Sequence, residues 1–205
     1  PPELAMIRRF VLVSLLGLLP LHEVAADQDR AAEPSTAPEI YGQGVRDTTA
    51  RSPEEERAGF HLPDGFEAQL FASEPQIAKP LNMAWDTRGR LWVTNTIEYP
   101  YPAKAGVQPR DSIKILEDTN GDGQADKVTT FADKLNIPMG LLPTAGGVIC
   151  FNIPDIIFLR DNDGDDKADE RIKILGPFDT TRDTHGMING LRRGPDGWIY
   201  ACHGF

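Results

Sequence analysis

The stretch "IKILEDTNGDGQADKVTTF" (113–131) decides the fold class, because it recurs 43 residues later as "IIFLRDNDGDDKADERIKI" (156–174). Each copy joins two β-prone runs through an acidic loop that contains glycine, as hairpins do. A second unit alternates with this one and consists of an apolar strand, a turn ending in Gly and another apolar strand. It occurs at residues 83–95, 140–152 and 190–204.

Together the two units predict a module of four strands that recurs about every 40–50 residues, which is typical of β-propeller blades. We therefore expect an all-β protein, with about two blades of a propeller plus part of a third. A β-sandwich is the alternative, because sandwiches also carry short strands at regular spacing. A propeller needs about four blades or more, so closure would require chain beyond Phe205 and this segment would be the front part of a longer protein.

The N-terminus predicts export. Arg8 and Arg9 precede an apolar run at 10–21, and small residues follow before Asp27. This is the layout of a secretory signal peptide over residues 1–26, with an uncleaved membrane anchor as the alternative. We expect a periplasmic or cell-envelope protein.

Between the signal and the repeats, residues 27–51 are polar and lack an apolar period, which predicts a disordered linker. Ser52 and Pro53 then predict a short helix as its N-cap and first residue. The domain is expected to span 52–205. The net charge of −10 disfavours nucleic acid as a partner, since phosphate binding needs a basic patch.

The first acidic loop has the spacing of a calcium loop. Oxygen donors stand at positions 1, 3, 5, 7 and 9, and position 7 would offer its backbone carbonyl: Asp118, Asn120, Asp122, Gln124 and Asp126. Calcium takes six to eight oxygens, and alternate side chains of a tight loop converge on one point. Gly123 at position 6 permits the bend. The β-prone flanks exclude an EF-hand. The simpler interpretation is an Asn-Gly and Asp-Gly hairpin turn.

The second acidic loop repeats the pattern with Asp161, Asp163, Asp165 and Asp169 at positions 1, 3, 5 and 9. Position 6 is Asp166 instead of Gly. Either the bend tolerates an Asp with positive φ, or the loop is a degraded copy. A loop that recurs in each module is expected to brace the fold rather than to perform chemistry.

Four phrases, at 52–93, 111–135, 161–175 and 194–200, together resemble the membrane-bound dehydrogenase family of planctomycete-type bacteria. That family is similar to the glucose/sorbosone dehydrogenases, which are soluble quinoprotein β-propellers. The resemblance implies an exported quinoprotein-like dehydrogenase that oxidises a sugar or alcohol. It also implies calcium, pyrroloquinoline quinone, and a c-type haem domain or cytochrome as electron acceptor.

The resemblance places the catalytic base at His185, nine residues before the "GPDG" turn that begins at Gly194. An imidazole with a pKa near neutral can accept a hydroxyl proton, but an ordinary loop histidine would look the same. His203 is a weaker candidate. Three arginines are candidate contacts for an anionic quinone or sugar, although solvated charges are the commoner explanation: Arg182, Arg192 and Arg193.

The alternative function is a non-catalytic β-propeller, stabilised by calcium, that binds polysaccharide or protein at the cell surface. The acidic loops alone support it. No G-x-G-x-x-G or Walker motif occurs, which disfavours nicotinamide and nucleotide chemistry.

Overall fold

The computed structural model describes residues 10–13, 49–181 and 184–204, and the chain separates into two compact units. The unit of residues 16–61 is described from residue 49 and contains α1 (Pro53–Ala58). Helix α1 begins as predicted, because the Ser52 hydroxyl accepts the N–H of Glu55 at 3.2 Å and the Glu55 carboxylate accepts the N–H of Ser52 at 2.8 Å. This reciprocal pair is a capping box.

The predicted signal peptide (1–26) lies outside the described residues except at β1 (Phe10–Val13). Strand β1 pairs in parallel with β11 (Ile199–Cys202). In the part of the chain that the structure describes, no helix is long and apolar enough to span a membrane. Export and the linker at 27–51, of which only 49–51 are described, stay predictions.

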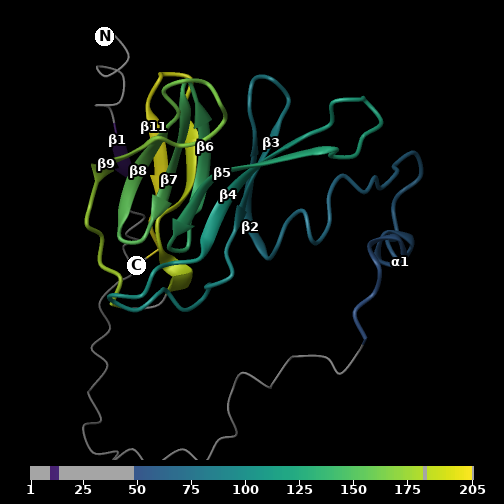
Figure 1. The fold of residues 1–205 in the computed structure, drawn as a ribbon, viewed down its shortest axis with the longest axis horizontal. Coiled ribbons are helices and arrows are strands. Elements are labelled where there is room, and N and C mark those ends of the chain that lie inside the picture. The colour runs from purple at the N-terminus through teal and green to yellow at the C-terminus, as the bar shows by residue number, and fades with distance from the viewer. Residues whose placement is uncertain (1–9, 14–48, 182–183, 205) are drawn as a thin grey trace, which may run out of the picture. The chain divides into compact units, whose positions relative to one another are not determined.

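The other unit contains two four-stranded antiparallel sheets whose strand order follows chain order, and a third sheet with the order β1–β11–β10, where β10 is Asn189–Arg193 (Figure 1). The first sheet contains β2 (Pro80–Trp85), β3 (Leu91–Asn95), β4 (Asp111–Glu117) and β5 (Lys127–Leu135). The second sheet contains β6 (Met139–Thr144), β7 (Gly147–Asn152), β8 (Asp155–Arg160) and β9 (Glu170–Leu175). In the third sheet, β10 pairs antiparallel with β11.

This arrangement confirms the all-β class and places each repeat unit as a hairpin. The apolar unit forms β2–β3, β6–β7 and β10–β11, and the acidic unit forms β4–β5 and β8–β9. The three sheets do not close on themselves within the described residues, so the structure establishes stacked meanders rather than a propeller.

The repeat extends to backbone detail. The first strand of each apolar hairpin carries one register shift, three residues long in every case: Pro80/Met83, Met139/Leu142 and Asn189/Arg192. A bulge that returns in the same strand of every hairpin, within one residue of the same position, marks a copied backbone and not a chance irregularity.

Apolar residues from neighbouring sheets form the core. Between the first and second sheets, Trp92 and Phe131 meet edge to face with ring centroids 4.7 Å apart and pack with Leu141. Between the second and third sheets, Phe151 packs with Leu191 and other buried residues. Burial of such side chains contributes about 1.5–3 kcal/mol each.

A polar link joins the first strands of the three sheets. The Asn82 side-chain oxygen accepts the N–H of Gly140 at 3.0 Å, and its amide donates to the Asn189 side chain at 3.2 Å. One residue of β2 therefore contacts both β6 and β10.

Candidate functional site

Meander connectivity sorts the loops into two ends, because successive antiparallel strands reverse direction. The turns at 86–90 and 145–146 lie at the same end as the two acidic loops, which we call the acidic end. The β3–β4 loop (96–110) and the connection at 176–188 lie at the other end, which we call the histidine end because it carries His185.

The first acidic loop is folded by its own carboxylates. The two oxygens of Asp118 accept the N–H groups of Gly121 and Gly123, each at 2.7 Å. Asp126 accepts the hydroxyl and the N–H of Thr119, and these bonds lower the pKa of Asp126. These two predicted calcium ligands thus act as turn acceptors.

The other predicted ligands of the first loop form a local chain. Asn120 accepts the N–H of Asp122 at 2.9 Å, and Asp122 accepts the N–H of Gln124 at 2.8 Å. No three acidic side chains of this loop come together to share an ion, as far as the described residues show.

The second acidic loop does gather acids. Carboxylate oxygens of Asp161, Asp163 and Asp169 lie within 4.8 Å of one another. Asp165, the fourth predicted ligand, instead pairs with the Lys167 ammonium at 3.2 Å. Three of the four predicted residues are therefore placed together, although exposed acids also cluster without a metal.

Asp166, at position 6 of the second loop, has φ 62°, and the equivalent Gly123 has φ 83°. The bend therefore tolerates an Asp in the left-handed region. Its carboxylate accepts Arg90 Nη1 at 2.8 Å and Arg88 Nη2 at 3.0 Å, both from the turn of the first sheet. Position 6 is thus a bridge between sheets and not a sign of degradation.

Arg90 is buried between two carboxylates. Its Nε donates to Asp86 at 2.8 Å, and Trp92 Nε1 donates to the same oxygen at 3.0 Å. Burial alone would raise the pKa of Asp86 and of Asp166, but hydrogen bonds from Trp92 and Arg90 outweigh it and hold both pKa values below the ordinary range. We call Asp86, Arg90 and Asp166 the ion bridge.

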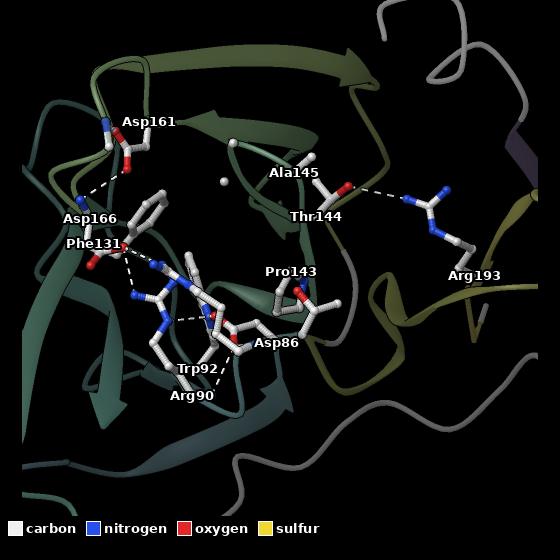
Figure 2. Close-up of a pocket in the computed structure, with 15 residues that line it drawn as sticks. Asp86, Arg90, Trp92, Phe131, Pro143, Thr144, Ala145, Asp161, Asp166 and Arg193 are labelled. Atoms are coloured by element: carbon white, nitrogen blue, oxygen red, sulfur yellow. Dashed lines mark hydrogen bonds and ion pairs between the residues drawn. The ribbon is translucent and has the colours of Figure 1, made fainter. Parts of the chain in front are cut away.

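The ion bridge forms one wall of a cavity of about 570 Å³ at the acidic end. Figure 2 shows Arg90 between Asp86 and Asp166, with Arg193 on the other side reaching Thr144. The Arg193–Thr144 hydrogen bond is 3.3 Å long. The two carboxylates of this wall, Asp86 and Asp166, are paired with the guanidinium groups of Arg90 and Arg88, so the wall offers no net charge that would select a ligand.

His185 lies in the short 3₁₀ helix Thr184–Gly186 with its side chain exposed. Its ring meets Tyr99 edge to face, with centroids 5.6 Å apart and an interplanar angle of 78°. The Thr184 hydroxyl donates to the Pro100 carbonyl at 2.8 Å. Two contacts with the β3–β4 loop thus position the histidine.

The β3–β4 loop is itself anchored by buried acid. Asp111 accepts the N–H of Glu98 at 3.0 Å and the N–H of Ile137 at 2.9 Å. Burial raises the pKa of Asp111. The Lys79 ammonium donates to the Tyr99 carbonyl and lies over the Tyr99 ring. These contacts make the loop a fixed support for His185.

The structure places the other predicted residues at different ends: His203 lies at the histidine end, where the N–H of its neighbour Gly204 donates to the Gly186 carbonyl at 2.8 Å. Arg193 lies at the acidic end, so the prediction that it could reach a ligand beside His185 is wrong. Arg192 donates to the carbonyl of its neighbour Leu191. His203 stacks on Phe178 with centroids 6.0 Å apart. Arg182 lies outside the described residues.

Sequence reasoning missed the ion bridge and the anchoring by Asp111. The signal for the bridge was available, because a non-glycine residue at position 6 needs a reason to adopt positive φ. The arginine-rich turn "TRGR" (87–90) offered that reason.

Comparison with known proteins places the chain in a family. Residues 52–205 match the model of the family described as Domain of unknown function (DUF7133), and the chain belongs to this family. Searches among curated proteins and among solved structures found no match.

Proposed function

We propose that this member of the DUF7133 family is part of an exported β-propeller that oxidises a hydroxyl group of a sugar or alcohol at the histidine end. The observation that supports this proposal is the exposed His185, held against Tyr99 by a loop that is itself anchored at several points. Catalytic groups are commonly carried on loops that a rigid scaffold positions.

His185 would act as the general base. A neutral imidazole would accept the hydroxyl proton, and the quinone that the resemblance implies would supply the two-electron oxidant that takes up the hydride of the same carbon. The edge of the Tyr99 ring limits rotation of the imidazole, and the Thr184–Pro100 hydrogen bond fixes the short helix beneath it. Both contacts would reduce the cost of aligning base and substrate.

The contacts at the histidine end do not single out residues for pyrroloquinoline quinone. An anionic quinone needs cations, but Lys79 is engaged with Tyr99, Arg110 pairs with Glu98, and Arg193 lies at the other end. We therefore assign no residue to the quinone. Transfer of electrons to a haem domain or cytochrome remains part of the proposal through the resemblance alone.

Calcium would have a separate, structural role. Asp161, Asp163 and Asp169 offer the oxygen donors that calcium prefers, and a divalent ion there would offset most of the repulsion among three adjacent carboxylates. This role places the metal at the acidic end and the chemistry at the histidine end.

Dye-linked oxidation by the full-length protein, with added quinone and calcium, tests the catalytic proposal over a panel of sugars and alcohols. We expect His185→Asn to lower the rate by about 10²–10⁴-fold, as loss of a general base does. His61→Asn is the matched control, because His61 is an exposed histidine of the other unit. Equal rates in both variants, or no oxidation by the unaltered protein, would reject the proposal.

The gathered acids favour a second candidate, a non-catalytic propeller that binds polysaccharide or protein and needs calcium only for stability. It predicts that His185→Asn leaves binding and stability unchanged, while Asp163→Asn abolishes the response to calcium. Binding of cell-wall polysaccharide to both variants distinguishes it from the dehydrogenase.

A further inference from the structure

One position of the repeat is buried in the second and third sheets and exposed in the first sheet. The first strands of the three hairpins align as "PLNMAW" (80–85), "PMGLLP" (138–143) and "INGLRR" (188–193). In this alignment Leu141 and Leu191 are 2% and 0% exposed, because each packs on the preceding sheet, whereas Met83 is 68% exposed. Its neighbour Trp85 is 57% exposed.

The edge of this open face is nevertheless already occupied. The N–H of Ala168 in the second acidic loop donates to the carbonyl of Phe131, on the outermost strand of the first sheet, at 2.8 Å. The N–H of Ala125, the equivalent residue of the first loop, donates to the carbonyl of Phe71 at 2.8 Å. Phe71 thus accepts the same hydrogen bond from the acidic loop of the first sheet as Phe131 of β5 accepts from the acidic loop of the second sheet.

Sequence and packing support the same equivalence. "LFAS" (70–73) corresponds to "TFAD" (130–133). Phe71 packs against Leu91 and Val93 and meets Trp85 with ring centroids 5.5 Å apart. Gln69 adds a hydrogen bond to the Asp122 carbonyl of the acidic loop. Residues 67–72 therefore make the contacts of an outermost strand, although the described residues contain no other strand of that sheet.

We propose that residues 67–72 are the outermost strand of a further four-stranded sheet, and that a later part of the same polypeptide supplies the other three strands. Those strands would be antiparallel and would lay an apolar face on Met83 and Trp85. The inference rests on the propeller part of the proposed function and not on its chemistry. In this arrangement the start of the domain completes the last sheet and so closes the ring of sheets.

A second copy of the chain fits this face less well. The strand that another molecule could offer without rearrangement is β10, and its residue Arg192 is an exposed cation, whereas Arg193 faces the second sheet. Placing Arg192 on Met83 and Trp85 would desolvate charge against an apolar surface, which is costly. A sheet like the first and second, whose packing faces are aliphatic and aromatic, avoids that cost.

Hydroxyl-radical footprinting tests the proposal without any substitution. Oxidation of Met83 and Trp85 is measured in residues 1–205 alone and in the full-length polypeptide. Because side-chain oxidation follows exposure, we expect both residues to react about tenfold more slowly in the full-length protein. Tyr101, 55% exposed in the β3–β4 loop, is the control that should not change, and buried Met187 should stay protected in both.

Equal oxidation of Met83 in the two proteins would overturn the proposal. Protection that grows with protein concentration would also overturn it, because a second copy would then cover the face. The readout is independent of catalysis, so a protein that oxidises no substrate could still show the protection, and an active enzyme could fail to show it.

Discussion

The first and second sheets share connectivity, a bulge and an acidic loop, yet they differ in what their loops and faces contact. The second sheet packs on the first through Leu141, and its loop reaches back through Asp166 to Arg90. The first sheet exposes Met83, and its loop has Gly123 where Asp166 stands. The difference teaches that copies of one repeat gain different stabilising contacts, depending on which sheets lie beside them.

The largest expected effect is the difference in stability loss between Leu141→Ala and Met83→Ala, which alter equivalent positions of the second and first sheets. We expect Leu141→Ala to lower the free energy of unfolding by about 3 kcal/mol, because it removes buried methyl groups and leaves a cavity. Met83→Ala should change it by less than about 0.5 kcal/mol in residues 1–205, since an exposed side chain loses little. Urea unfolding followed by circular dichroism measures both. Similar losses would contradict the equivalence of the two positions.

The next effect concerns the ion bridge. Asp166→Asn keeps a residue that tolerates positive φ but removes the charge that pairs with buried Arg90. We expect a loss of about 2 kcal/mol, below the usual cost of breaking a buried pair because Asp86 remains. Asp133→Asn is the control, since Asp133 is an exposed partner of Arg171, and it should lose less than about 0.5 kcal/mol. Equal losses would contradict the expectation that the ion bridge stabilises the fold more than an exposed ion pair does.

Calcium should distinguish the two acidic loops. At a calcium concentration ten times the dissociation constant, binding adds about 1.4 kcal/mol to stability. We expect Asp163→Asn to remove this gain and Asp122→Asn to preserve most of it, because only the second loop gathers three acids. The melting temperature with calcium and with chelator is the measurement. No shift in the unaltered chain, or a shift lost with Asp122→Asn, would refute this expectation.

A smaller effect is expected on acidification, which removes charge but leaves the side chains in place. The folded pKa values of Asp86 and Asp166 lie below the ordinary value of about 3.9. Their contribution to stability is therefore complete above that value and is lost as the pH falls through the folded pKa. The stability gap between the unaltered chain and Asp166→Asn should shrink below about pH 4. A gap that stays constant on acidification would contradict the charge-based explanation.

Local patterns predicted the fold well because hairpins and caps are local. The alternation around the acidic loops fixed β4–β5 and β8–β9, and Ser52 with Pro53 fixed the start of α1. The bridge from Asp166 to Arg90 spans 76 residues in sequence, so no window of the chain contains it. The gathering of three acids in one loop but not in the other depends on side-chain directions that spacing alone does not set.

The error over Arg193 had a simpler cause. Strand β10 separates Arg193 from His185, and an extended strand advances about 3.3 Å per residue. Five residues of strand therefore carry the arginine to the opposite end of the sheet. Counting residues along the chain suggested proximity, whereas counting along a strand would have excluded it.

Asp166 also has a consequence for how such arrays diversify. Half of the glycine codons are a single base from an aspartate codon, so a copied loop can gain or lose a salt bridge to its neighbour through one substitution. The bend keeps its backbone shape through the exchange, as the φ values of Gly123 and Asp166 show. Duplicated modules can thus form contacts that are specific to their own neighbours, without any change in the fold that they share.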